Sequence, residues 1–202
     1  MKEITNRKKQ AIETKEKIYN ISIQLIKEHG YDNVKITTIC EKAGVSVGSF
    51  YHHFKNKAGI VIELYSICDI YFSETVLPTL LKTSNSYCNK IIEYIASQMQ
   101  YVIDIGNDCS TQLYKAQITD GNEFFLSMER GLPNGLCYLV QCAQTNGELE
   151  RNIAAIDLAK EILIISRGIL YNWCVSEGTS DIIYESKRMI SNYLTYYKTK
   201  KQ

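Results

Sequence analysis

The side chains with the most specific chemistry lie in a short stretch between Val34 and Gly59. This stretch offers hydroxyl, phenol, imidazole and ammonium groups with few acids. Such groups can donate hydrogen bonds to phosphate oxygens and to base edges in the major groove of a duplex. The stretch therefore predicts a surface that contacts nucleic acid. Its outward-facing candidates are Val47, Gly48, Ser49, Tyr51 and His52.

Two short helices joined by a tight turn are expected to position these side chains. Apolar residues at helical spacing predict the first helix, and Gly44 can adopt the positive φ that ends it. Ser46 is expected to cap the second helix by accepting a hydrogen bond from a backbone N–H near Ser49. Phe50 and Phe54, four residues apart, should then turn inward, so that the opposite face of this helix points to solvent.

From Gly30 to Val61 the chain resembles the tetracycline-repressor (TetR) family of bacterial regulators. The resemblance rests on the Ala-Gly-Val-Ser turn, the Tyr-His-His-Phe run and the Lys-Asn-Lys that follow in register. It implies an all-α fold of about nine helices. Residues 1–56 would form a three-helix, helix-turn-helix DNA-binding domain, and residues 57–202 a helical domain for effector binding and dimerisation.

The resemblance also implies roles for particular residues. The outward residues of the second short helix would contact bases and phosphates, and Lys57, at the start of the next helix, would bind a phosphate. One position departs from the family pattern, because Lys35 stands where a Ser or Thr usually caps the first short helix. The complete set of expected DNA contacts is Lys35, Thr37, Thr38, Ser46, Val47, Gly48, Ser49, Tyr51, His52, Lys55 and Lys57.

Composition and charge agree with a globular DNA-binding protein. Of the 202 residues, 45% are apolar and 22% charged, and the long 3.6-residue periodicity with only two prolines predicts a helical fold. Residues 1–60 carry eleven basic and six acidic side chains, a net +5, whereas residues 61–202 carry twelve and sixteen, a net −4, which together give the whole-chain +1. The asymmetry favours an N-terminal module that faces a polyanion, although solvated faces also vary in charge.

The sequence offers little support for an enzyme, a metal site or a membrane protein. Seven cysteines are scattered singly and the three histidines are not near a cysteine pair, so we expect no metal and no cofactor. No nucleophile-base arrangement is visible, and an enzyme is only a remote alternative. The sequence leaves open whether any of the cysteines is redox-active. Without a long apolar run or a signal peptide, the protein is expected in the cytoplasm, with no membrane partner.

A long helix should begin near Ala58, link the two domains and end at Pro78. The helices beyond it carry more tyrosine than a core needs, which suggests an aromatic pocket for a small molecule of unknown identity. The alternative is that many of these tyrosines are half exposed and line nothing. The expected lining residues are Tyr65, Phe72, Tyr94, Gln98, Tyr114 and Trp173.

The last two expected helices, about 154–177 and 180–198, carry apolar residues at helical spacing. The resemblance implies that they form the homodimer interface, and burial within one subunit is the alternative. The protein would thus be a repressor that binds a palindromic double-stranded operator as a homodimer and is released by a small hydrophobic or aromatic ligand. A regulator without such an effector, acting as an autorepressor or through a protein partner, is the alternative. The expected interface residues are Leu158, Ile162, Ile165, Ile169, Ile182, Met189, Ile190 and Tyr193.

Overall fold

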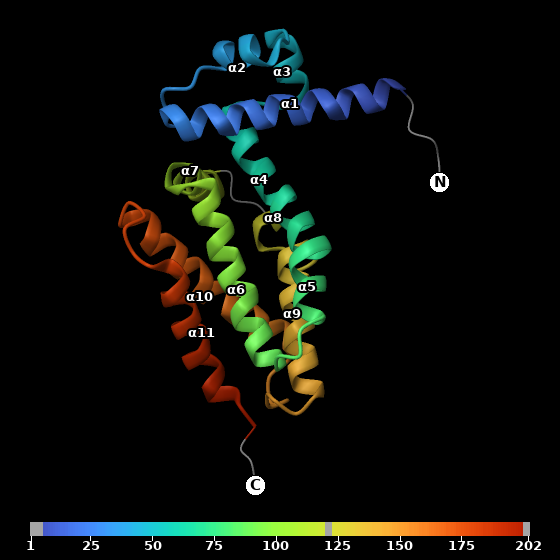
Figure 1. The fold of residues 1–202 in the computed structure, drawn as a ribbon, viewed down its shortest axis with the longest axis vertical. Helices are drawn as coiled ribbons and strands as arrows, with labels where there is room; N and C mark the ends of the chain where they lie inside the picture. The colour runs from blue at the N-terminus through green and yellow to red at the C-terminus, as the bar shows by residue number, and fades with distance from the viewer. Residues whose placement is uncertain (1–5, 120–122, 200–202) are drawn as a thin grey trace.

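The computed structural model describes residues 6–119 and 123–199, and these fold as helices (Figure 1). If the continuous rod α4–η1–α5 is counted once and the one-turn α8 is left out, nine helices are formed by the described residues. The all-α prediction, with an N-terminal helix-turn-helix and a C-terminal helical domain, is confirmed. The elements are α1 (Asn6–His29), α2 (Ile36–Ala43), α3 (Val47–His53), α4 (Lys57–Tyr71), the π-helix η1 (Phe72–Val76), α5 (Leu77–Leu81), α6 (Tyr87–Ile105), α7 (Asn107–Thr119), α8 (Glu123–Leu126), α9 (Gly131–Thr145), α10 (Ala155–Val175) and α11 (Ile182–Tyr197).

The N-terminal helices enclose a small core of their own. Apolar side chains of α1, α2 and α3 pack around Ile39 and Phe50, both fully buried. The first half of α4 belongs to the same core through Ile60, Val61 and Leu64. The division between residues 56 and 57 stays a prediction, and the core extends beyond it because α4 contributes side chains to the N-terminal helices.

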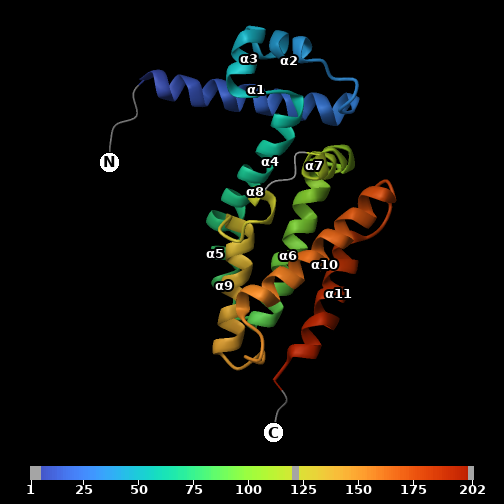
Figure 2. The same cartoon turned by 180° about the vertical axis from the view of Figure 1, so that it is seen from behind.

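The body below this module is a bundle in which α11 packs along α6 and α9 packs along α10 (Figure 1). Seen from behind, α10 crosses between α9 and α11 (Figure 2). The bundle core is apolar and includes Tyr94, whose buried hydroxyl donates a hydrogen bond of 3.0 Å to the Leu132 carbonyl oxygen. The upper end of the bundle, at α7, contacts α4 and α1, so the body supports the N-terminal module at more than one point.

The prediction that the long helix ends at Pro78 is wrong. The chain continues through one π-helical turn, η1, into α5, and Pro78 lies in the first turn of α5. A proline in an α-helix lacks the N–H that would bond to the preceding turn, and its ring clashes with a carbonyl there. We attribute the continuation to the wider π-turn, which alters the hydrogen-bonding pattern just before the proline.

Among residues 6–119 and 123–199, no helix combines the length and the apolar character needed to cross a lipid bilayer.

Candidate nucleic-acid interface and internal pocket

The turn between α2 and α3 has the geometry that its sequence predicts. Gly44 adopts φ +62°, and the N–H of Val45 donates a 3.0 Å hydrogen bond to the Cys40 carbonyl oxygen. Ser46 Oγ accepts a 3.0 Å hydrogen bond from the Ser49 N–H, which confirms the predicted cap. At the start of α2, Lys35 makes no side-chain cap, as expected. The orientation of α3 is therefore fixed by local bonds at its start and by its buried phenylalanines.

Helices α2 and α3 lie at the end of the molecule farthest from the C-terminal helices (Figure 1). Phe50 and Phe54 point into the core, and the face opposite them is open to solvent. The large apolar or aromatic side chains exposed on α3 are Val47 and Tyr51. Of the predicted set, Thr38, Ser49 and Lys57 are half-buried, and the exposed members are Lys35, Thr37, Ser46, Val47, Gly48, Tyr51, His52 and Lys55.

Lys57 has partners within the protein. Its ammonium donates hydrogen bonds to the carbonyl oxygens of Tyr31 and of Val34, the latter at 2.9 Å, and lies 4.1 Å from the centre of the Tyr31 ring. These bonds join the start of α4 to the loop between α1 and α2. The phosphate contact expected of Lys57 stays a prediction, and the structure gives this residue a positioning role that the sequence did not suggest.

Replacing Lys57 by methionine should lower the free energy of unfolding by about 2 kcal/mol, because two loop carbonyls lose a charged donor. Urea denaturation followed by circular dichroism measures this change. Lys55→Met, on an exposed neighbour, is the control and should leave the unfolding free energy within about 0.5 kcal/mol of the wild type. An equal stability of the two variants would contradict the positioning role. If the slope of DNA affinity against salt also falls by about one, the ammonium contacts a phosphate as well.

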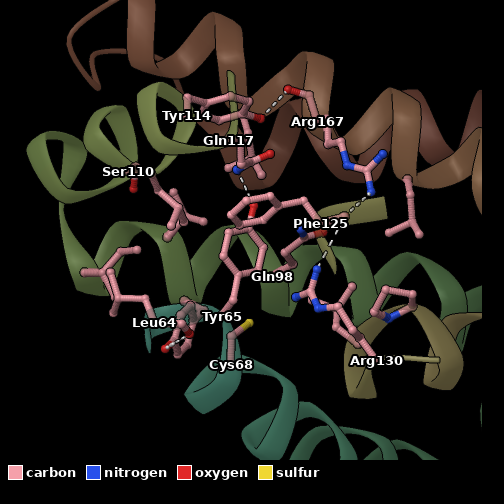
Figure 3. A pocket seen from close by; sticks show the side chains of 18 residues that line it. Leu64, Tyr65, Cys68, Gln98, Ser110, Tyr114, Gln117, Phe125, Arg130 and Arg167 are labelled. Atoms are coloured by element: carbon pink, nitrogen blue, oxygen red, sulfur yellow. Dashed lines mark hydrogen bonds between the residues drawn. The ribbon is translucent and has the colours of Figure 1, made fainter. Parts of the chain in front are cut away.

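A pocket lies in the body directly below the module, between α4, α6, α7, α9 and α10 (Figure 3). Its free volume is about 70 Å³. Its wall is mostly apolar, with Tyr65, Tyr101, Tyr114 and Phe125 as aromatic members. Two arginines, Arg130 and Arg167, and two glutamines, Gln98 and Gln117, supply its larger polar groups.

The structure brings together only part of the predicted pocket. Tyr65, Gln98 and Tyr114 line it. Phe72 and Tyr94 instead pack edge to face in the bundle core, with ring centres 4.9 Å apart, and Trp173 is buried in the same core. These three residues do not line this pocket, because size and helical position do not determine whether a buried ring meets a neighbouring side chain or an open space.

Arg130 is held by a bidentate ion pair that the sequence did not reveal. Its Nε and Nη2 atoms lie 2.8 and 3.2 Å from the two carboxylate oxygens of Asp69, and the pair is almost completely buried. Asp69 Oδ1 also accepts a 3.0 Å hydrogen bond from the Leu132 N–H at the start of α9. A Cβ at Gly131 would lie 2.2 Å from the Asp69 carbonyl oxygen, so only glycine permits this close approach. Helix α4 is thus tied to the start of α9 beside the pocket.

The polar groups of the pocket are neutral except for the arginines. Burial raises the pKa of Tyr65 to about 12, although Arg130 and Arg167 act in the opposite direction, so the phenol stays protonated at neutral pH. Gln117 donates a hydrogen bond to the Tyr65 hydroxyl, and Tyr114 donates one of 2.7 Å to the Arg167 carbonyl oxygen. Sequence reasoning missed Arg130, Arg167 and Gln117, and only for Arg167, an arginine within a mainly apolar helix, was a signal available.

The predicted dimer interface is corrected by burial. Five of its eight residues lie in the core of a single chain and are closed to any partner: Leu158, Ile162, Ile169, Ile182 and Ile190. Ile165, Met189 and Tyr193 are partly exposed and border a shallow groove between α10 and α11. Six of the seven exposed large apolar side chains of these helices, all except Ile156, form another set, which we call the α10–α11 face: Ile164, Tyr171, Val175, Tyr184, Met189 and Tyr196.

Three of the cysteines, Cys68, Cys88 and Cys109, are poorly suited to redox chemistry at neutral pH. Burial, assisted by a neighbouring carboxylate in each case, raises the pKa of Cys68 and of Cys88 to about 12. Burial likewise raises the pKa of Cys109 to about 11. The thiolate is the reactive form, so these thiols are weak nucleophiles. Within the described residues, no three His, Cys, Asp or Glu side chains are arranged to hold a metal ion.

A family model and individual proteins of known name both match this chain. Residues 18–64 match the family model described as "Bacterial regulatory proteins, tetR family". The HTH-type transcriptional repressor BepR of Brucella suis is 27% identical over 197 residues, which cover 93% of each chain. An HTH-type transcriptional regulator of Staphylococcus aureus is 34% identical over 53 residues, which are 26% of this chain but only 29% of that protein.

Solved structures share the fold over nearly the whole chain. FadR of Thermus thermophilus, a TetR-family transcriptional repressor solved in complex with lauroyl-CoA, superimposes with a TM-score of 0.70 at 16% identity. The superposition covers 90% of this chain and 93% of that one. The arrangement of module and body is therefore shared with repressors of known fold.

Proposed function

The chain belongs to the TetR family of transcriptional regulators, and on that premise we propose that it is a repressor that binds a palindromic operator as a homodimer and is released by a small molecule. The observation that carries the proposal is the solvent-open face of α3, held in place by the Ser46 cap and the buried Phe50. A rigid short helix with an exposed donor surface fits the major groove, and its N-terminal residues approach the base edges.

DNA contact would come from the exposed residues of α2, α3 and the α3–α4 turn. Tyr51 can donate its hydroxyl to a phosphate, Gly48 lets the backbone come close, and Val47 offers an apolar contact to a thymine methyl. The net +5 of residues 1–60 supports this assignment, since the cationic surface supplies affinity that does not depend on sequence. Because its target is bacterial DNA, the site of action would be the cytoplasm.

A homodimer would form through the α10–α11 face. Its exposed apolar side chains lie along both helices, and exposed apolar surface of this kind is typical of an association site. A two-fold axis through this face would place the two α3 helices on the same side of the assembly. Half-sites read on one side of a duplex lie about 34 Å apart or a multiple of it, so the dimer sets the spacing of the operator.

The pocket would control DNA binding through α4. Leu64 belongs to the core of the N-terminal module and also lines the pocket, and Tyr65 and Cys68 on the same helix line it too. A ligand that needs a different position of α4 would shift the population of α3 positions away from the one that DNA requires. Complexes of FadR from Bacillus subtilis with stearoyl-CoA and from Thermus thermophilus with lauroyl-CoA support ligand binding by proteins of this fold.

A regulator without a small-molecule effector is a second candidate, and one observation favours it. The free volume of about 70 Å³ is below that of a pocket that would accept a ligand without rearrangement. Thermal-shift screening with hydrophobic metabolites separates the two candidates, because a ligand that binds only the folded state raises the midpoint of unfolding. An enzyme has no support from the relatives, which are named as regulators.

Replacing Tyr51 by alanine should weaken binding to the operator about 10-fold or more, since a phosphate or base contact contributes about 1–3 kcal/mol. Fluorescence anisotropy with a labelled fragment from upstream of the coding sequence measures the change. Tyr138→Ala is the matched control, because Tyr138 on α9 is 46% exposed against 53% for Tyr51 and lies outside the proposed surface. Equal affinities of the two variants would contradict the proposed DNA surface.

A further inference from the structure

Two guanidinium groups converge on one backbone carbonyl in the pocket. Arg130 Nη1 lies 3.5 Å and Arg167 Nη2 lies 3.4 Å from the carbonyl oxygen of Phe125. The two arginines come from opposite sides, Arg130 from the residue just before α9 and Arg167 from α10, with Phe125 between them (Figure 3). Both bonds are long, whereas a guanidinium bonded to a carboxylate has N···O distances of about 2.7–2.9 Å. The Phe125 carbonyl oxygen between the arginines therefore makes only long hydrogen bonds with them.

The charge of the site is only partly compensated. No aspartate or glutamate is among the described residues that line the pocket, and the Asp69 carboxylate is paired with Arg130. Arg167 has no carboxylate within ion-pair distance in the described part of the chain. Arg167 is half-buried in a mostly apolar wall, where a charge without a carboxylate partner is costly. An anion would offset this cost.

The other large polar side chains of the pocket are bonded within the protein and do not compete for an anion. Gln117 is bonded to the Tyr65 hydroxyl, and Gln98 accepts a 2.7 Å hydrogen bond from Ser166 Oγ. Tyr114 is bonded to the backbone of α10. Recognition of a polar ligand group is therefore concentrated at the two arginines, which favours a ligand with a single acidic group and an otherwise apolar body.

The ring of Phe125 occupies the space beside this position. It packs edge to face on Tyr65 with ring centres 5.1 Å apart, and its residue is buried although α8 is a single turn. The free volume of about 70 Å³ is too small for an additional ring, since a cavity of about 150 Å³ is needed to hold benzene. A ligand ring must therefore take the place of a ring already present. Phe125 is the candidate, because its carbonyl lies between the two arginines and its ring packs on Tyr65.

We propose that the pocket binds an aryl carboxylate that replaces Phe125. The carboxylate would lie between Arg130 and Arg167 in place of the Phe125 carbonyl, and the aryl ring would pack on Tyr65 in place of the Phe125 ring. The inference deepens the proposed function, because it names the chemical class of the effector for the same pocket. Entry of the ligand displaces α8 from Arg130 and from Tyr65 on α4, whose ring packs against that of Phe125.

The probe is 3-phenylpropionate, in which two carbons separate the ring from the carboxylate as they separate the ring from the carbonyl carbon in a phenylalanine residue. Isothermal titration calorimetry on the full chain compares it with the neutral 3-phenylpropionamide and with octanoate, an acid without a ring. The acid should bind at least 10-fold more tightly than either. An amide that binds as well overturns the anion requirement, and octanoate that binds as well overturns the aryl requirement.

Two variants test the two halves of the site, and their expected changes in ligand affinity have opposite signs. Arg167→Met should weaken binding of 3-phenylpropionate 10- to 100-fold and leave the amide unchanged, since only the charge-assisted bond is lost. Phe125→Ala should tighten binding of the acid, because the ligand then displaces no ring. Each variant is first melted without ligand to confirm that it folds. An unchanged affinity of either folded variant overturns the assignment.

Failure of the ligand inference can be distinguished from failure of the proposed function. Operator binding is measured on the same preparations without any probe. If the protein binds its operator but 3-phenylpropionate does not bind, the aryl carboxylate inference is overturned and the repressor proposal stands. If operator binding itself is absent, the proposed function fails, whatever the calorimetry gives.

Discussion

Replacing Asp69 by alanine is expected to lower the free energy of unfolding by about 3–5 kcal/mol, because it leaves the Arg130 guanidinium buried without its carboxylate. The side chains of Arg130 and Asp69 are only 9% and 13% exposed, so water cannot take over the lost interaction. The Leu132 N–H at the start of α9 loses its acceptor in the same step. Urea denaturation followed by the fluorescence of Trp173, the single tryptophan, which is buried in the body, measures the loss.

The double variant Asp69→Leu with Arg130→Met is the control for this prediction. It removes both charges and keeps apolar volume at the site, so it should be more stable than Asp69→Ala by at least about 1 kcal/mol. If the single variant loses less than about 1 kcal/mol, the ion pair does not tie α4 to α9. The proposed coupling between a ligand in the pocket and the position of α4 would then need another contact.

Replacing Tyr171 by glutamate should convert the protein to a monomer and weaken operator binding by at least about 100-fold. Tyr171 and Ile164 are 57% and 63% exposed on α10, so a charge there leaves the core of the chain intact but would be desolvated in a dimer. A monomer reads one half-site and retains mainly the sequence-independent affinity, which is typically 10³-fold or more below specific binding. Sedimentation velocity gives the assembly state, and anisotropy gives the affinity.

Tyr138→Glu makes the same change on α9, outside the α10–α11 face, and should remain a dimer with unchanged operator affinity. Ile164→Glu provides an independent substitution within the face and should behave like Tyr171→Glu. A Tyr171→Glu protein that stays dimeric would place the interface elsewhere on the molecule.

The helix-turn-helix could be predicted in detail because its geometry depends on neighbouring residues. The αL conformation of Gly44, the Ser46 cap and the inward Phe50 each follow from a residue type and a spacing of a few positions. The sequence of helices in the body was also predictable, since amphipathic periodicity marks each one. The end of the long helix was not, because the π-turn before Pro78 has no comparable signature in the sequence.

The site residues of the body depend on contacts between distant segments. Asp69 and Arg130 are 61 positions apart, and nothing near either residue identifies its partner. On α10 the apolar side chains surround more of the helix than a single stripe, so periodicity does not separate Ile162, in the core, from Ile164, at the surface. The same limit led the sequence to place Trp173 in the pocket and to overlook Arg167.

The central claim is that two copies of this chain bind one duplex through their α3 helices. Sedimentation equilibrium of the full chain with a promoter fragment at low salt tests it directly, because the mass of the complex gives the number of chains bound. We expect a free dimer and a complex of one duplex with an even number of chains, and Tyr51→Ala should remain a dimer but bind more weakly. A monomer that leaves its own promoter fragment unbound would contradict the claim.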